Sequence, residues 1–299
     1  MRHSLFLYED DERLVRKVAP FLESGLRRGD PAIVIAERAK CERLAGALGS
    51  PAGAVSFVDR DAFYTRPEAA LAGYDGRVRR LVRDGAHAIR VYAELPACGT
   101  DAQWNPWIRY EAIVNRALVH HPLWVMCGYD AREVSEWVVD GALATHPEVL
   151  ADDWARNAHY HRPEELVRAR TPTPAPITGL HPLPVDSDAR GFREGLSAEL
   201  EAAEVSAPEA ENMIIAAAEV LANARRHGGP AVSVSVGRVE DRFVCEVSDD
   251  GPGIDDPLTG YLPPRPGHAG GAGLWVARQL TRQLDLVPAP HGQTVRLWT

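Results

Sequence analysis

Hydrophobic and polar positions along residues 1–170 follow a pattern that predicts strands and helices in alternation. Short apolar runs typical of buried strands occur at Ser4–Tyr8, Pro31–Ala36, Ala54–Val58, His87–Ala93 and Leu123–Cys127. Stretches with apolar residues at helical spacing occur at Asp11–Arg28, Arg38–Leu48, Pro67–Asp84, Trp107–His120 and Ala131–Ala144. Strands that alternate with helices of this length predict an α/β domain whose mainly parallel sheet is covered on both faces.

The pattern changes after a break at residues 171–185. Five prolines interrupt this segment, which predicts a Pro-rich linker between a domain at 1–170 and a second at 186–299. Beyond the linker, the expected elements are two helices, a hairpin, a helix and a last strand: Asp188–Ala203, Pro208–His227, Val232–Val236 with Phe243–Val247, Gly273–Gln283 and Thr294–Trp298. Helices followed by strands predict an α+β layer with helices on one face of a sheet.

Composition narrows the class of protein. The 299 residues are 45% hydrophobic and 25% charged, which fits two globular domains with their own cores. No apolar run is long enough for a membrane span and residue 1 does not begin a signal peptide, so we expect a cytoplasmic protein with no membrane partner. A net charge of −9 argues against direct binding of nucleic acid. Four widely spaced cysteines without a CxxC pair predict reduced thiols.

Lysine is rare in this chain. Only Lys17 and Lys40 occur, and neither follows a glycine. A phosphate-binding loop of the GxxxxGK[ST] type is therefore excluded.

Two polar residues share one face of the helix predicted at Pro208–His227. Glu219 and Asn223 are four residues apart, and the residues around them are small or apolar. The Asn223 oxygen suits Mg²⁺, which prefers hard oxygen ligands and bridges phosphates. The Glu219 carboxylate is placed to accept a proton from an attacking hydroxyl group or water. Taken alone, the pair also fits a polar stripe on a half-exposed helix.

Glycines surround two further segments. Asp249, at the end of a predicted strand, precedes Gly251 and Gly253, and a carboxylate there can accept from the amine of adenine while glycine lets the base approach. A tight turn would explain the same residues. Gly270, Gly271 and Gly273 open the next helix, where free backbone N–H groups and the helix dipole favour phosphate. A flexible loop is the alternative there.

Together these segments resemble the N, G1 and G2 boxes of the GHKL ATPases, over about residues 188–299. The resemblance implies a Bergerat α+β sandwich that binds ATP and Mg²⁺, with Glu219 as catalytic base and Asn223 as the ligand of ATP-bound Mg²⁺. It implies an adenine-side threonine at Thr294 on the last strand. The implied nucleotide-binding residues are Asn223, Arg226, Asp249, Gly251, Gly253, Ile254, Gly270, Gly271, Ala272, Gly273, Leu274 and Thr294.

The surroundings of the boxes favour one branch of that superfamily. No histidine precedes an acidic residue, as the acceptor of a histidine kinase usually does, and too few residues lie before Glu219 for a dimerising hairpin. A transducer domain like that of gyrase is not expected, because the sequence ends at Thr299. The sequence from Glu219 to Gly228 and from Gly273 to Leu280 is similar to that of RsbA-type anti-sigma regulatory proteins of actinobacteria.

That resemblance implies a serine/threonine kinase of an anti-anti-sigma (STAS) protein that also sequesters a sigma factor. A homodimer is possible by the same comparison. Two alternatives stay open: a non-catalytic ATP-dependent binding module, and an atypical sensor histidine kinase.

The first domain resembles the MEDS domain, a sensory module. The resemblance covers about residues 1–168 and rests on His3–Tyr8, Gly25–Asp30, Cys127–Asp130, His146-Pro147 and Tyr160–Pro163. It implies a RecA-like fold that binds an unknown small-molecule signal. The lack of a phosphate loop argues against nucleotide hydrolysis in this domain.

Metal binding in the first domain is not favoured by spacing. The candidate ligands, which show no CxxC or HxxxH spacing, are His120, His121, Cys127, His146, His159 and His161. Cys127 at a strand end is more typical of a buried small side chain. Aromatic residues that line either a pocket or the core are Tyr8, Trp104, Trp107, Tyr110 and Trp124.

Overall fold

The computed structural model describes residues 1–96, 98–185, 189–262, 272–288 and 292–299. The chain divides into two compact units, residues 1–170 and 171–299. The first is α/β with a mainly parallel sheet and the second is α+β with an antiparallel sheet, which confirms both expected fold classes. None of the helices in the described part of the chain is long and apolar enough to cross a membrane.

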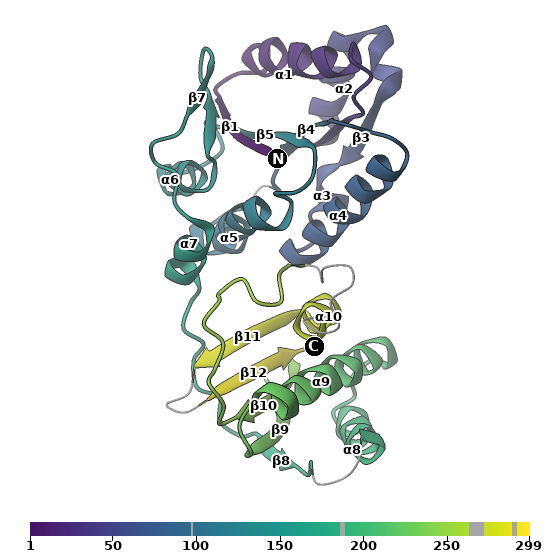
Figure 1. Ribbon diagram of the computed structural model, residues 1–299, viewed down its shortest axis with the longest axis vertical. Helices are drawn as coiled ribbons and strands as arrows, with labels where there is room; N and C mark the ends of the chain where they lie inside the picture. Colours follow the sequence, from purple (N-terminus) through teal and green to yellow (C-terminus); the bar gives the residue numbers. More distant parts are fainter. Residues whose placement is uncertain (97, 186–188, 263–271, 289–291) are drawn as a thin grey trace. The chain divides into compact units, whose positions relative to one another are not determined.

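The first unit is built around a seven-stranded sheet (Figure 1). Its strands are β1 (Arg2–Tyr8), β2 (Ala32–Ala36), β3 (Val55–Asp59), β4 (Ile89–Glu94), β5 (Leu123–Asp130), β6 (Glu148–Leu150) and β7 (Trp154–Arg156). Its helices are α1 (Asp11–Leu26), α2 (Arg38–Leu48), the 3₁₀ turn η1 (Ser50–Ala54), α3 (Arg60–Phe63), α4 (Pro67–Arg83), α5 (Asp101–Ala117), α6 (Glu136–Thr145) and α7 (Pro163–Arg170).

Helices cover both faces of this sheet. The strand order is β3-β2-β4-β5-β1-β6-β7, and every neighbouring pair is parallel except β6 with β7. Phe6 and Tyr8 of β1 pack with Leu14 of α1 and Leu44 of α2 on one face. The helices α4 and α5 lie on the other face (Figure 1). Burial on both sides explains why β2 is apolar throughout, without the alternation of a half-exposed strand.

Capping residues set two helix starts differently from the expected ones. The helix expected from Trp107 begins at Asp101, because Thr100 and Gln103 form a reciprocal capping box. The helix expected from Ala131 begins at Glu136, where Ser135 accepts from the backbone of the first turn. Both boundaries were wrong by five or six residues for this local reason.

The second unit is a five-stranded antiparallel sheet with helices on one face. Its elements are β8 (His181–Leu183), α8 (Ala189–Ala202), α9 (Ala207–His227), β9 (Val232–Val239), β10 (Arg242–Asp249), α10 (Gly273–Leu280), β11 (Gln283–Pro288) and β12 (Gln293–Trp298). The strand order is β11-β12-β10-β9-β8. Apolar residues of α8 and α9, such as Phe192 and Leu221, meet the strand residues Val236, Val247 and Val295 in one buried core.

Two strands of this sheet were not predicted. The helix expected at Gly273–Gln283 ends at Leu280, and β11 begins at Gln283 and pairs with β12. The strand β8 lies inside the segment expected to be linker and pairs with β9 at the edge of the sheet. Pro182 is tolerated in β8 because an edge strand leaves one side of its backbone unpaired.

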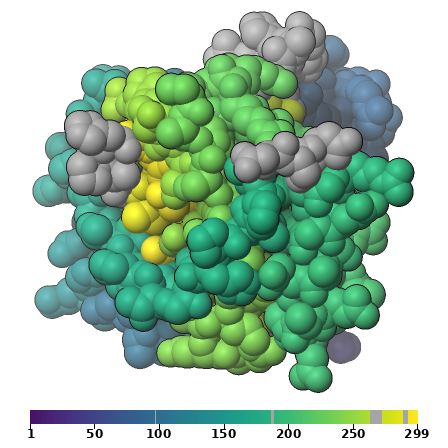
Figure 2. Space-filling model, turned by 90° about the horizontal axis from the view of Figure 1, so that it is seen from below, coloured from purple at the N-terminus to yellow at the C-terminus, as the bar shows by residue number. Residues whose placement is uncertain are grey.

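The face of the sheet opposite the helices is covered in part by the Pro-rich segment. Arg296 of β12 is buried, pairs with Glu246 of β10 at 2.6 Å and donates to the carbonyl of Ala175 at 2.9 Å. Figure 2 shows teal residues of this segment beside the yellow residues of the last strands. Residues 171–185 therefore contribute to this unit.

Helix α9 depends on its buried side for stability. Leu221→Ala removes a side chain that is 3% exposed, so we expect the unit to lose about 2–5 kcal/mol of unfolding free energy. Ile215→Ala on the same helix is the control, because that side chain is 41% exposed and its loss changes stability by about 0.5 kcal/mol or less. Hydrogen exchange of α9 peptides measures both. Equal effects of the two changes would contradict the assigned core.

Candidate functional site

Glu219 and Asn223 lie on α9 beside the stripe of side chains that enters the core. Ala216, Val220 and Ala224 of this stripe are buried in the core, which fixes the rotation of the helix. Glu219 is exposed and Asn223 is half-buried. The Asn223 side chain can thus offer an oxygen to a cation, and the Glu219 carboxylate, one turn away, can accept a proton.

Helix α10 begins against these two side chains. A Cβ atom at Gly273 would lie 2.5 Å from the Asn223 side-chain nitrogen and 3.1 Å from a Glu219 carboxylate oxygen. Glycine is therefore the residue that lets the N-terminus of α10 approach α9 with both side chains in place. Helical spacing placed Glu219 and Asn223 together, and the structure adds Gly273 to the same point.

The N-terminus of α10 has backbone N–H groups available. Among the described residues, no side chain caps this end, and the carbonyl of Ala272, the residue before the helix, accepts from the backbone of Val276. Unpaired N–H groups and the positive end of the helix dipole favour an anion. Gly273 is buried and Leu274 half-buried. Gly270 and Gly271, expected in the same loop, lie outside the described residues.

Asp249 ends β10 beside the loop that follows α9. Its carboxylate accepts from the backbone N–H of Gly251 at 2.9 Å. A Cβ atom at Gly251 would lie 2.6 Å from the Cα atom of Gly228, so the two loops touch through glycine. Gly253 has a φ of +78°, which favours glycine for conformational reasons. The carboxylate is thereby held close to the C-terminal end of α9.

Thr294 does not share the sheet face of Asp249. It pairs with Ser248, and the two hydroxyl groups are 2.7 Å apart. Successive strand residues point to opposite faces, and the neighbouring pair Val247 and Val295 lies in the core under the helices. Thr294 therefore points to the face of the sheet without helices, and its expected role beside adenine stays a prediction. Gln293, which pairs with Asp249 and is buried, takes the helix-facing position.

The remaining expected residues lie around this centre. Arg226 is exposed three residues after Asn223 on α9, and Ile254 is half-buried after the Asp249 loop. The described part of the next segment folds onto α10, because Leu258 is buried and the centre of the Tyr261 ring lies 3.8 Å from the guanidinium carbon of Arg278.

Comparison with known families agrees with this division of the chain. Residues 185–299 match the model of the histidine kinase-like ATPase domain. Residues 2–147 match the model of MEDS, the methanogen/methylotroph, DcmR sensory domain. The chain joins a MEDS domain to a histidine kinase-like ATPase domain. A comparison with curated proteins finds no match. The ATPase domain makes this an ATP-binding regulatory protein of kinase-like architecture, and such domains typically bind ATP with Mg²⁺.

The MEDS domain has a pocket at the carboxyl ends of β4 and β5. This end of a parallel sheet is where ligands bind in open α/β folds. Its walls include Lys40, Arg60, Glu94, Trp104, Tyr129 and Asp130. Of the aromatic residues named from the sequence, Trp104 lines it, whereas Trp107 and Tyr110 pack edge-on with Tyr64.

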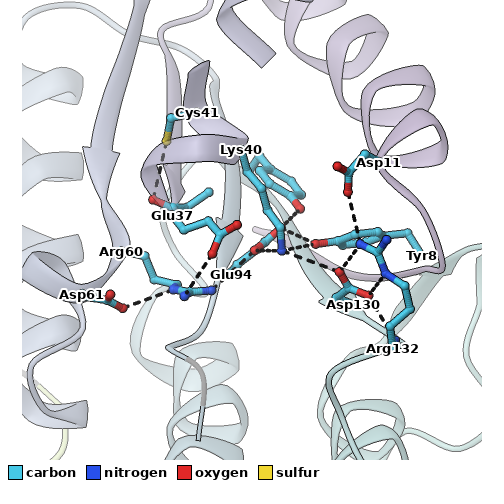
Figure 3. Close-up of polar contacts among 12 residues, drawn as sticks. Tyr8, Asp11, Glu37, Lys40, Cys41, Arg60, Asp61, Glu94, Asp130 and Arg132 are labelled. Atoms are coloured by element: carbon cyan, nitrogen blue, oxygen red, sulfur yellow. Dashed lines mark hydrogen bonds and ion pairs between the residues drawn. The ribbon is translucent and has the colours of Figure 1, made fainter. Parts of the chain in front are cut away.

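Lys40 is the centre of a polar network in this pocket (Figure 3). Its ammonium group donates to the Tyr8 hydroxyl at 2.7 Å and to Glu94 at 3.0 Å. Tyr8 in turn donates to Glu94 at 2.8 Å. Burial and the charge of Glu94 raise the pKa of Tyr8, so its hydroxyl group remains a donor. The rarity of lysine was noted in the sequence, but nothing there indicated this role.

Acidic residues also surround the carboxyl end of β1, where Tyr8 lies. Arg132 donates to Asp130 at 2.6 and 2.8 Å and holds the pKa of that carboxyl group below its usual range. Asp10 caps α1 by accepting from Arg13 at 2.6 Å, and Asp11 lies in the first turn. Carboxylates thus take the helix end that would bind phosphate in a nucleotide-hydrolysing domain.

The histidines and cysteine considered as metal ligands separate into two groups. His121 pairs with Asp75 at 3.0 Å, and His159 and His161 are exposed. Cys127 and His146 are both buried and lie together with two further potential ligands.

Loss of the lysine at the pocket should destabilise the MEDS domain. Lys40→Met leaves the buried Glu94 without its nearest cation, which costs about 3 kcal/mol or more. Lys17→Met, at the only other lysine, removes one exposed hydrogen bond to a backbone carbonyl and costs about 1 kcal/mol or less. Urea denaturation of the two variants tests this difference. A Lys40 variant as stable as the Lys17 variant would contradict the proposed role of the network.

The close approach at Gly273 should be needed for nucleotide binding. Gly273→Ala displaces the flexible ends of Asn223 and Glu219 without touching the core, so we expect a folded protein whose ATP affinity falls about tenfold or more. Gly195→Ala on α8 is the control, because a Cβ atom there meets only Leu183 at 3.5 Å. Titration calorimetry with Mg-ATP measures both. Unchanged affinity in Gly273→Ala would place the nucleotide elsewhere.

Proposed function

We propose that this protein is an ATP-dependent anti-sigma regulatory protein of the cytoplasm. Its ATPase domain phosphorylates a serine or threonine of an anti-anti-sigma (STAS) protein and sequesters a sigma factor. The MEDS domain binds a small-molecule signal that controls the exchange between these partners.

The observation that supports phosphoryl transfer is the meeting of Glu219, Asn223 and the N-terminus of α10. Asn223 would hold Mg²⁺, which would neutralise charge on the ATP phosphates, and the N–H groups of α10 would bind the phosphate oxygens. The partner's hydroxyl oxygen attacks the γ-phosphorus in line as the bond to the ADP oxygen breaks. Glu219 takes the hydroxyl proton, and ADP is the leaving group.

The exposure of Glu219 supports a protein substrate rather than water. A carboxylate on the outer surface of α9 is accessible to a hydroxyl group on another folded protein. Docking of that protein would cover the carboxylate and exclude solvent, which strengthens electrostatic effects at the reacting atoms. Sigma-factor capture uses the same ATP-bound domain without transfer. A homodimer of the ATPase domain fits the proposed family branch.

The kinase proposal predicts that Glu219→Gln slows phosphoryl transfer strongly but does not weaken ATP binding. The rate of phosphoserine or phosphothreonine formation on a cognate STAS partner should fall by about 10²–10⁴-fold, the usual contribution of a general base. Glu211→Gln, at another exposed glutamate of α9, should leave the rate unchanged. Mass spectrometry of the partner after incubation with Mg-ATP measures the product.

Two outcomes would replace the kinase proposal. ATP binding with no phosphorylated partner would support a non-catalytic binding module in which ATP shapes the docking surface. Acid-labile phosphate on the protein itself would support a histidine kinase. Transfer that survives Glu219→Gln would retain the kinase but remove Glu219 as its base.

A further inference from the structure

Four potential metal ligands meet inside the MEDS domain. They are His3 of β1, Glu111 of α5, Cys127 of β5 and His146, which follows α6. All are buried, and one ligand atom from each lies within 4.8 Å of the other three. Because the residues come from four elements, no short motif in the sequence brings them together.

His146 presents a free ring nitrogen to this cluster. Its Nδ1 lies 2.7 Å from the backbone carbonyl of Ala142, which can only accept, so Nδ1 carries the proton. Nε2 then holds a lone pair, lies 3.7 Å from Glu111 and has no hydrogen-bond partner although the side chain is fully buried. An unpaired buried polar atom is costly and indicates a missing partner.

His3 is oriented in the same way. The Asn115 amide nitrogen donates to the carbonyls of Glu111 at 3.1 Å and Thr145 at 2.7 Å, which leaves its Oδ1 as an acceptor. His3 Nδ1 donates to that oxygen at 3.1 Å. Its Nε2 points inward, 3.0 Å from Glu111 and 3.2 Å from the Cys127 sulfur. Metal-binding histidines commonly donate their outer N–H to a carbonyl in this manner.

A buried ion pair explains only part of the arrangement. A protonated His3 paired with Glu111 would satisfy those two side chains. The Cys127 thiol would also have a partner, because it donates to Glu111 at 3.9 Å, but Nε2 of His146 would stay without a hydrogen bond. One species that accepts lone pairs from all four residues accounts for the whole cluster.

We infer that His3, Glu111, Cys127 and His146 bind one Zn²⁺ ion. Two imidazole nitrogens, a thiolate and a carboxylate are donors that zinc uses in four-coordinate sites, whereas Mg²⁺ and Ca²⁺ prefer oxygen alone. Binding forms one bond from the metal to each donor and releases the Cys127 thiol proton to solvent. The thiolate and carboxylate neutralise the divalent charge.

The site needs little adjustment to hold the ion. Zinc bond lengths of about 2.0–2.3 Å imply ligand atoms about 3.3–3.8 Å apart. The present separations lie on both sides of that range, from 3.0 Å between His3 and Glu111 to at most 4.8 Å. Four protein ligands leave no open position, so the ion is structural: it joins β1 to α5, β5 and the end of α6. This role is independent of phosphoryl transfer.

Metal analysis of the full-length chain tests the inference directly. After incubation with Zn²⁺ and dialysis, elemental analysis should find about one zinc ion per chain. The Co²⁺ form should show thiolate-to-metal absorption and the visible bands of tetrahedral cobalt. Zinc should also raise the thermal midpoint of the MEDS domain, since a ligand stabilises the state that binds it. No retained metal and no cobalt spectrum in the unmodified protein would overturn the inference.

Variants identify the ligands. His146→Gln and Cys127→Ser should each weaken zinc binding by more than about 100-fold, because outer-shell changes alone cost 10–100-fold. Cys127→Ser should also abolish the thiolate absorption of the cobalt form. The controls His161→Gln and Cys98→Ser change residues outside the cluster and should bind zinc like the unmodified chain. Circular dichroism checks that each variant folds. Equal zinc binding in all four variants would show that the metal lies elsewhere.

Discussion

The close contact between α9 and α10 at Gly273 is the constraint on which the candidate ATP site depends. A side chain at that position would occupy the space of the Asn223 amide. Core packing of Ala216, Ala217 and Val220 fixes α9 from its other side, so the helix cannot move away to make room. Two helices from distant parts of the sequence therefore present a carboxylate, an amide and free N–H groups at one place.

The sequence predicted those parts of this site that depend on local periodicity. Helical spacing was enough to place Glu219 and Asn223 on one face, and the end of an alternating strand was enough to locate Asp249. The sheet face on which Thr294 lies could not be predicted, because strand register is set by the pairing with Ser248, which the sequence does not state. Strand β11 was not predicted, because Gln283–Pro288 comes soon after a helix. Only its pairing with β12 identifies this segment as a strand.

The MEDS domain shows a different limit of sequence reasoning. Its sheet was predictable from apolar runs, but its two polar networks were not. The pocket network needs Lys40, Glu94 and Tyr8 from three elements, and the buried cluster needs four. Parallel strands bring residues far apart in sequence to neighbouring positions, so spacing rules for ligands on one helix or hairpin do not apply. Tyr129 belongs to both regions, because it lines the pocket and its ring meets His146 edge-on.

The candidate ATP site and the buried cluster of the MEDS domain differ in their exposure to solvent, which argues for different roles. In the ATPase domain, Glu219 and Arg226 are exposed, so the chemistry there depends on what a second protein brings to the surface of α9. In the MEDS domain the cluster around His146 is closed, so no substrate reaches it and its contribution is to stability. The pocket at Lys40 is intermediate in accessibility, because its charged and aromatic walls open at the end of a strand. A signal that binds there would compete for Lys40 and Glu94 with the protein's own hydrogen bonds, so it must offer matching donors and acceptors.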